Sequence, residues 1–340
     1  MGFLSPRSAA ERTRVTPPFL SGLGGKATFA LALALVASAA VSATAQHHDH
    51  GTQAPVERNA DAKRDSQLDA VRRATERFRD IEVARSEGFV RFGKDEGPLM
   101  GEHWYRKAGA DAPAADSIDL ERPGTLMYAV IGGDRVLVGV AYSVRLRPGD
   151  AMPEGFAGSS DRWHVHDVER MLRASTEERP VLRWIGDRWL ERRRRAGEDR
   201  TWLTMVHAWV HLPNPDGPFA DQHRVIPYLK LGLPAAWARD GGLAAARGLQ
   251  LATEGGCRST VGGQLWVASA SRDQRRVIEA ECDRLAGRMR AGIAKHRMDP
   301  AALHVEARDV WLVLDAAIRR TLTERQRARV ASITEHPMAP

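Results

Sequence analysis

Apolar and polar residues follow three different patterns along the chain, and each pattern predicts a different kind of structure. Early in the chain, Leu68, Val71, Ala74 and Phe78 recur at spacings of three and four. This spacing places them along one side of a helix, so it predicts an amphipathic helix. Gly88 follows at a position that suits the C-terminal end of such a helix.

The second pattern consists of β-rich runs in the middle of the chain. Residues 125–144 hold two such runs on either side of a Gly-Gly-Asp turn, which predicts a β-hairpin. The segments RWHVHD (162–167) and TWLTMVHAWVHL (201–212) also have the composition of strands, and 182–197 between them is predicted to be a helix. The middle of the chain is therefore predicted to be α+β, with an antiparallel β-sheet and flanking helices.

The third pattern is helical and fills the C-terminal part of the chain. An alanine-rich stretch over 234–252 is followed by a glycine-rich passage and then by helical periodicity from Ser271 to about residue 333. Three helix starts in this part carry capping residues, namely Ser271 with Gln274, Asp299 with Pro300, and Thr323 with Gln326. We therefore predict an α+β domain over 66–263 and a C-terminal helical region over 264–335.

The first 65 residues are predicted to lie outside the folded domain. Residues 27–40 are almost wholly apolar, basic residues precede them, and Ala43-Thr44-Ala45 follows. The apolar run is shorter than the ~20 residues that a membrane-spanning helix needs, so residues 1–45 are predicted to be a secretory signal peptide. The mature protein should then be exported, to the periplasm or outside the cell, without a transmembrane segment. Residues 46–65, polar and rich in histidine, are predicted to be a disordered tail.

Charge and cysteine content narrow the classes of partner. The chain has a formal charge of +7, with four basic residues and one acidic residue in the predicted leader, so the mature chain carries +4. The dense basic run from Arg192 to Arg195 lies among acidic residues, which is typical of a solvated helix face. Basic patches interleaved with aromatic residues are not evident, so nucleic acid is not an expected partner. A disulfide between Cys257 and Cys282 is permitted in an oxidising compartment, and the sequence leaves their pairing open.

Five histidines in or beside the predicted strands are the residues best suited to chemistry. Walker A loops, GxSxG elbows, HExxH helices and GxGxxG fingerprints are absent from the sequence, which disfavours the enzymes that depend on them. His164 and His166 are two apart, so they share a face of a strand. His207 and His211 are four apart, so they share a face in a strand or in a helix. Imidazole suits zinc and copper, and we predict a divalent transition metal site made from His103, His164, His166, His207 and His211.

His207 is the predicted centre of this site, and His211 is its weaker member because it lies at the predicted end of a strand. Glu102 and Asp167 adjoin the histidines in the sequence, and either carboxylate could bind the metal or orient an imidazole. Two interpretations without a metal stay open. One histidine could act as a general base in a cleft for a small molecule, or all of them could be structural.

The C-terminal region resembles a known family. Leu322, Thr323 and Gln326, preceded by LDAAIRRT, are similar to the signature of the periplasmic LTxxQ (Spy/CpxP-like, heavy-metal-resistance) proteins, and a degenerate copy without the leucine spans 270–274. The resemblance covers about a fifth of the chain. It implies an exported helical protein that acts as a chaperone or metal-stress sensor, with a protein partner or dimer contact through these helices.

The middle of the chain resembles a group of uncharacterised secreted bacterial proteins. The segments MGEHWY (100–105) and HAWVHLPNPDGPFAD (207–221) are similar to an MGxHY motif and an HxWxxxPNPxGxFA motif of that group. This sequence departs from the group after Asp221, where Gln222-His223-Arg224 replaces a Trp-Asn-Pro-like run. The resemblance implies export but no activity.

From these observations we expect an exported metal-binding protein with a histidine-rich site on the sheet domain, acting in metal or envelope stress. One alternative is an exported metal-dependent enzyme with an open coordination position at the same site. The other alternative is a periplasmic chaperone or interaction protein that acts through the helical tail.

Overall fold

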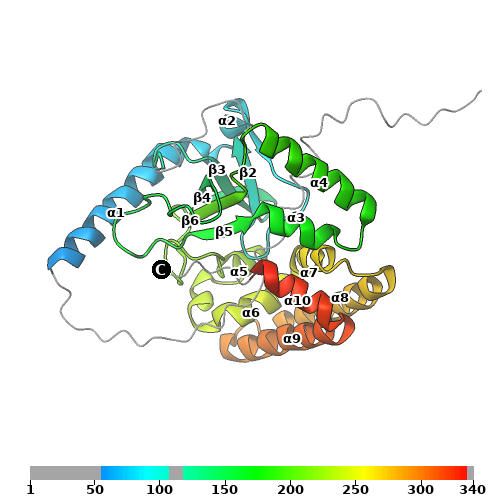
Figure 1. Cartoon of the computed structure of the whole chain (residues 1–340). Helices are drawn as coiled ribbons and strands as arrows, with labels where there is room; N and C mark the ends of the chain where they lie inside the picture. Colours follow the sequence, from blue (N-terminus) through cyan, green and yellow to red (C-terminus); the bar gives the residue numbers. More distant parts are fainter. Residues whose placement is uncertain (1–54, 107–117, 335–340) are drawn as a thin grey trace, which may run out of the picture.

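The computed structural model of the chain describes residues 55–106 and 118–334, and Figure 1 shows their arrangement. The predicted signal peptide over 1–45 and the three histidines of the predicted tail lie outside the described residues. A six-stranded antiparallel sheet forms one half of the structure, and α-helices flank it and build the other half. The predicted α+β class is confirmed.

The N-terminal helical segment begins earlier than the sequence pattern predicted. It consists of α1 (Pro55–Thr75), the 3-10 turn η2 (Glu76–Arg79) and α2 (Ile81–Ser86). The tail predicted over 46–65 is therefore wrong in its second half, where good helix formers and pairs such as Arg64 with Asp61 extend the helix toward its N-terminus. Gly88 follows α2 with φ of +85°, a left-handed conformation that ends helices.

The sheet contains six strands in the order β1-β2-β3-β4-β6-β5, and every neighbouring pair is antiparallel. The strands are β1 (Phe89–Arg91), β2 (Glu102–Arg106), β3 (Thr125–Ile131), β4 (Asp134–Leu146), β5 (His164–Asp167) and β6 (Trp202–Ala208). The predicted hairpin is β3 with β4. Gly132 and Gly133 have φ of +61° and +97°. A two-residue turn needs such positive φ values to match the twist of the two strands.

The two faces of the sheet are covered by different elements. On one face, Leu126, Tyr128 and Val206 pack with Phe78 under the N-terminal helices, and the Tyr128 hydroxyl donates to the Phe78 carbonyl at 2.6 Å. On the other face, Met127, Ala141 and Trp209 pack against Ile226 of the short helix α5 (Ile226–Lys230) and form a separate core cluster with it. The second face is the one that carries the histidines described below.

Two helices connect β5 to β6. The first, α3 (Val168–Thr176), starts where Asp167 accepts a hydrogen bond from the Arg170 backbone at 2.9 Å, and sequence periodicity did not predict it. The second, α4 (Pro180–Arg195), is the helix predicted over 182–197. Figure 1 shows α4 at the outer edge of the molecule, beyond α3.

The C-terminal helices form one apolar core that extends across the predicted domain boundary. The elements are η3 (Ala235–Trp237), α6 (Ala238–Ala252), α7 (Gly256–Val267), α8 (Arg272–Lys295), α9 (Pro300–Thr321) and α10 (Glu324–Thr334). The glycine-rich passage is itself the helix α7, so the boundary expected between residues 263 and 264 falls inside a helix. Because α6 and α7 share their core with α8 and α9, the helical region begins before residue 264.

Gly248 allows α6 and α9 to approach closely. A Cβ atom at Gly248 would lie only 1.9 Å from the carbonyl oxygen of Ala307. Any side chain there would force the two helices apart, because interiors are packed without free space.

The three predicted helix starts are confirmed by their caps. Ser271 and Gln274 form a capping box, Asp299 accepts from the Ala302 backbone at 3.0 Å, and Thr323 and Gln326 bond reciprocally. The two capping glutamines also bond each other, at 2.8 and 3.0 Å. The repeated Ser/Thr-x-x-Gln motif therefore joins the start of α8 to the start of α10 inside the fold.

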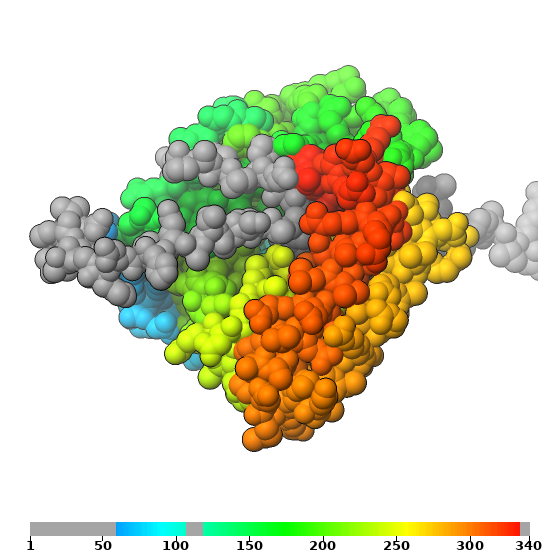
Figure 2. Space-filling view, turned by 90° about the horizontal axis from the view of Figure 1, so that it is seen from below, coloured from blue at the N-terminus to red at the C-terminus, as the bar shows by residue number. Residues whose placement is uncertain are grey.

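The last helix attaches the helical half to the sheet half. The buried Arg329 of α10 bonds Glu177 and Glu178, which follow α3, at 2.8 and 2.6 Å. Figure 2 shows α10, in red, against the green part of the chain that includes α3 and α4. The C-terminal helices are thus packed onto the α+β part.

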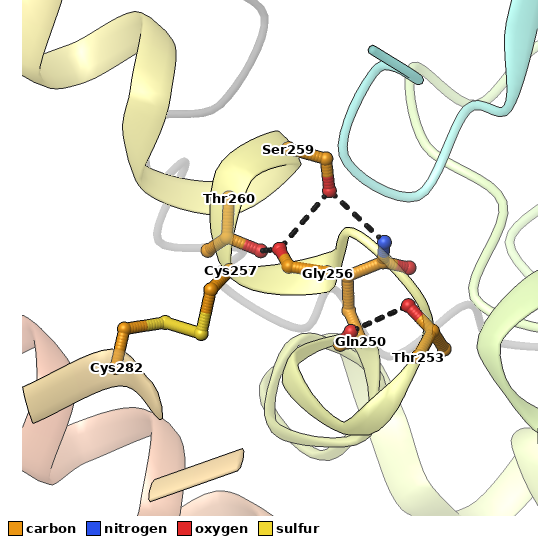
Figure 3. The surroundings of a disulfide bond; sticks show 7 residues. All are labelled: Gln250, Thr253, Gly256, Cys257, Ser259, Thr260 and Cys282. Carbon is orange, nitrogen blue, oxygen red and sulfur yellow. Dashed lines mark hydrogen bonds between the residues drawn. A yellow bond between two sulfur atoms is a disulfide. The ribbon is translucent and has the colours of Figure 1, made fainter. Parts of the chain in front are cut away.

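A disulfide between Cys257 and Cys282 joins α7 to α8, with the two Cα atoms 5.8 Å apart. Figure 3 shows it beside a polar cluster at the start of α7, where the Gln250 amide donates to the Ser259 hydroxyl at 3.1 Å. The two cysteines are 25 residues apart in the sequence, so the disulfide closes a loop of that length. Such a loop restricts the unfolded chain, which raises the stability of the fold.

Replacing both cysteines, in Cys257→Ala/Cys282→Ala, should lower the free energy of unfolding by about 3 kcal/mol. Urea denaturation followed by circular dichroism measures the change. A reductant should lower the stability of the wild type toward that of the variant and leave the variant unaffected. Equal stability of the oxidised wild type and the variant would contradict this prediction.

Candidate functional site

Four histidine side chains meet on one face of the sheet. His207 of β6 is central, with ring centroids 5.9 Å from His103 of β2 and 5.0 Å from His164 of β5. His166, two residues further along β5, lies 5.0 Å from His164. The structure therefore brings together four of the five predicted site residues, and we call them the histidine cluster.

Strand register explains why these side chains share a face. His164 is paired with Met205, and His207 lies two residues beyond Met205 on the same strand. Successive side chains alternate between the two faces of a strand, so residues 164, 166, 205 and 207 all point to one side. The same alternation places Val206 and Ala208 in the core on the opposite face.

His103 reaches the cluster across two intervening strands. Because β3 and β4 separate β2 from β6, the backbones of His103 and His207 would lie about 14 Å apart on a flat sheet. Their ring centroids are only 5.9 Å apart, so the sheet curves inward and both side chains lean over β3 and β4. Gly139 and Ala141 of β4 lie beneath this space, and a Cβ atom at Gly139 would come within 2.7 Å of the Ala208 carbonyl oxygen and 3.1 Å of the Met127 side chain.

Burial keeps the clustered imidazoles neutral. Loss of solvation lowers the pKa of His103 and of His164 to about 4, and that of His166 to about 3, with repulsion between the rings adding to the effect for His164 and His166. The pKa of His207, whose residue is only 2% exposed, is also lowered well below its usual value by burial and by the other three rings. A neutral imidazole has one ring nitrogen with a free lone pair.

Asp221 is a polar residue that borders the cluster, and it was not among the predicted site residues. Its backbone carbonyl oxygen lies 3.1 Å from Nδ1 of His207. A carbonyl only accepts, so Nδ1 carries the proton and Nε2 of His207 has the lone pair. The Asp221 carboxylate lies 3.6 Å from Nδ1 of His164, an atom that is buried without a hydrogen bond. In the sequence, the position of Asp221 at the end of the stretch NPDGPFAD was the one signal that could have marked it as a site residue.

His211 does not belong to the cluster. Its Nε2 lies 2.8 Å from the Thr75 hydroxyl and its Nδ1 lies 3.7 Å from the Glu76 carboxylate, on the side of the N-terminal helices. The predicted strand over 201–212 ends at Ala208, and the alternation of faces ends with it. The expectation that His207 and His211 share a face is therefore wrong.

Other polar residues near the cluster in sequence have structural partners. Glu102 is buried on the opposite face and pairs with Arg135 at 2.8 Å, while Asp167 caps α3. His223 accepts from the Val225 backbone at 3.3 Å through Nδ1, which leaves Nε2 to donate to the Leu212 carbonyl at 3.0 Å. These three residues hold the fold around the cluster.

The spacing of the rings is compatible with metal coordination, although the rings do not form a ready-made site. Two imidazoles bound to one zinc ion at about 2.0–2.1 Å place their ring centroids roughly 5 Å apart. The three neighbouring ring pairs of the cluster, His103 with His207, His207 with His164 and His164 with His166, lie 5.0–5.9 Å apart. Among residues 55–106 and 118–334, no three His, Cys, Asp or Glu side chains are positioned to hold a metal ion as they stand. Binding would thus require the rings to turn about their side-chain bonds.

Comparisons with known proteins assign no family to the chain. No family model, no curated protein and no solved structure matches it. The resemblances to the LTxxQ proteins and to the secreted bacterial group therefore stay predictions. Within the described part of the chain, none of the helices combines the length and the apolar character needed to cross a membrane.

The low pKa values predict that acid destabilises the protein. Below about pH 6.5 the histidines of the unfolded chain take up protons, while the clustered histidines stay neutral until about pH 4. Stability should therefore fall as the pH drops from 6.5 toward 4, by at most about 1.4 kcal/mol per pH unit for each fully shifted histidine. Urea denaturation at pH 7, 6 and 5 measures this slope.

The variant His103→Gln/His166→Gln serves as the comparison for the pH dependence. It removes two of the shifted groups, so its stability should depend less steeply on pH than that of the wild type. Identical slopes for the two proteins would show that the clustered histidines are not the groups responsible.

Proposed function

We propose that this protein is an exported metal-binding protein whose histidine cluster binds a divalent transition metal ion, zinc or copper. His103, His164 and His207 would be ligands, and His166 or the Asp221 carboxylate would supply a fourth donor. The observation that supports this proposal is the unbroken series of ring contacts that runs through His207. These rings come from the adjacent strands β5 and β6 and from β2, which two strands separate from β6.

The protonation state of the cluster supports a metal ligand role. A histidine binds a metal through a neutral imidazole, and burial keeps the clustered imidazoles neutral at physiological pH. Protons should therefore compete only weakly with the metal ion even well below pH 6, a pH range in which exposed histidines become protonated and release their metals.

The surroundings of His207 and His164 support the same role. Histidines that bind metals almost always donate their other ring N–H to a carbonyl or carboxylate, and His207 does so to the Asp221 carbonyl. Buried polar atoms without partners are rare in native proteins, and an absent ion is one explanation of them. The Nδ1 atom of His164 is such an atom.

Donor number favours metal binding over metal-dependent catalysis. A catalytic zinc site keeps one position open for water, whereas a structural or storage site is closed by four protein ligands. His166 and Asp221 both border His164 and could close the coordination sphere. A metal-dependent enzyme would be the better description only if neither residue binds the ion.

Replacing the central ligand should abolish tight binding. His207→Ala should weaken zinc or copper affinity at least about 100-fold, because one of four ligands carries a few kcal/mol of a total of ~10–16 kcal/mol. The affinity is measured by chelator competition on a tag-free protein in which His47, His48 and His50 are replaced by asparagine. Elemental analysis of the purified protein identifies the metal.

His211→Ala is the matched control for this experiment. It removes a partly buried histidine four residues away that contacts Thr75 instead of the cluster, so metal affinity should stay within about twofold of the wild type. Equal affinities of His207→Ala and wild type, or no binding of either metal by the wild type, would refute the proposal.

Asp221→Asn distinguishes a ligand from a supporting residue. The substitution keeps the backbone carbonyl that bonds His207 and removes the negative charge beside His164. Loss of a supporting contact costs roughly 10- to 100-fold in affinity, and loss of a bound carboxylate should also change the electronic spectrum of the cobalt-substituted protein. An unchanged cobalt spectrum would assign the fourth position to His166.

A further inference from the structure

The helix α4 (Pro180–Arg195) contacts the rest of the protein along a narrow strip. Gly186 and Leu190 are its only buried residues among those that the structure describes. Gly186 allows close contact with α3, because a Cβ atom there would lie 3.1 Å from the Leu172 side chain. Most of the surface of α4 therefore faces away from the protein (Figure 1).

The first turns of α4 expose large apolar side chains. Val181 is 69% exposed, Leu182 44%, Trp184 61% and Ile185 40%. In the parts of the chain that the structure describes, no other five-residue stretch exposes more than one large apolar side chain. Isolated exposed apolar residues are ordinary, whereas a cluster of this size marks an interaction surface.

Arginines continue the apolar face toward the end of the helix. Positions 181, 184, 185, 188, 192 and 195 follow the helical spacing that places residues along one side. The first three are apolar, and the last three are Arg188, Arg192 and Arg195. The Arg188 guanidinium lies 5.4 Å from the centre of the Trp184 ring. We call these six residues the α4 stripe.

The charges of the α4 stripe are largely uncompensated. Arg195 lies 3.8 Å from Glu191 and remains 83% exposed in its side chain. Within residues 55–106 and 118–334, Arg188 and Arg192 form no ion pair within 4 Å. The stripe therefore presents net positive charge directly beside exposed apolar side chains.

We propose that α4 docks the protein onto the surface of a lipid bilayer that contains anionic lipids. Val181, Trp184 and Ile185 would enter the boundary between headgroups and acyl chains, where tryptophan is favoured. Arg188, Arg192 and Arg195 would contact lipid phosphates, which guanidinium groups bind with two parallel hydrogen bonds. The inference does not depend on the metal site.

Charge and shape favour a bilayer over a second copy of the chain. A symmetric contact between two α4 stripes would bring clustered arginines near each other, and α4 has only Asp187 and Glu191 to offset its six arginines. A convex helix at the edge of the molecule also fits a flat surface better than it fits another convex helix. Anionic headgroups complement the arginines, and the acyl boundary accepts the apolar residues.

The test is co-sedimentation of the full chain with vesicles of phosphatidylcholine alone or with 40% phosphatidylglycerol. The wild type should bind the anionic vesicles at least 10-fold more tightly than the neutral ones, and salt should weaken the binding. Arg188→Gln/Arg192→Gln/Arg195→Gln should reduce binding to anionic vesicles about 100-fold, since each basic residue contributes roughly a factor of five. Trp184→Asn/Ile185→Asn should reduce it at least 10-fold.

Matched controls separate the α4 stripe from net charge and general apolarity. Arg258→Gln/Arg276→Gln/Arg319→Gln changes the charge equally at exposed sites on other helices, and Val305→Asn/Leu312→Asn removes exposed apolar residues of α9. Both controls should bind vesicles within twofold of the wild type. The proposal fails if the control arginines matter equally or if anionic vesicles are not bound. It also fails if Trp184 instead supports a dimer in analytical ultracentrifugation without vesicle binding.

Discussion

The antiparallel pairing of β6 with β4 and β5 is the constraint on which the histidine cluster depends. A shift of this register by one residue would turn His207 toward the N-terminal helices and move Val206 out of the core. The register is well determined because Val206 and Ala208 are completely buried on the opposite face. Hydrophobic burial on one face of the sheet thus directs the imidazoles to the other face.

The cluster combines chemistry that is costly to bury. The four imidazoles lose solvation together, which lowers their pKa values, whereas the Asp221 side chain at the edge of the cluster stays half exposed. Each shift favours the neutral form of the group concerned, so the site avoids isolated buried charges. Trp209 keeps the Asp221 loop in place by donating its indole N–H to the Ala220 carbonyl at 2.6 Å.

The helical half is held together by two internal links and is attached to the sheet half by a third. The paired glutamines join two helix starts, the disulfide joins α7 to α8, and Arg329 joins α10 to the turn after α3. In contrast, α4 is held mainly through α3. A helix with so little buried surface can expose apolar side chains without loss of the core, which is what an interaction surface requires.

The sequence by itself determined the features that depend on neighbouring residues. Gly132-Gly133 specified the hairpin, Ser271, Asp299 and Thr323 specified helix starts, and spacing by two placed His164 and His166 on one face. Only the tertiary structure decided which histidines meet, because sheet curvature and pairing between distant strands bring His103 to His207. Tertiary contacts also explain why His211 does not share a face with His207. Beyond the end of β6, the Trp209 backbone N–H donates to the Pro218 carbonyl at 2.8 Å. A loop partner, which periodicity cannot reveal, therefore ends the alternation that sequence spacing assumed.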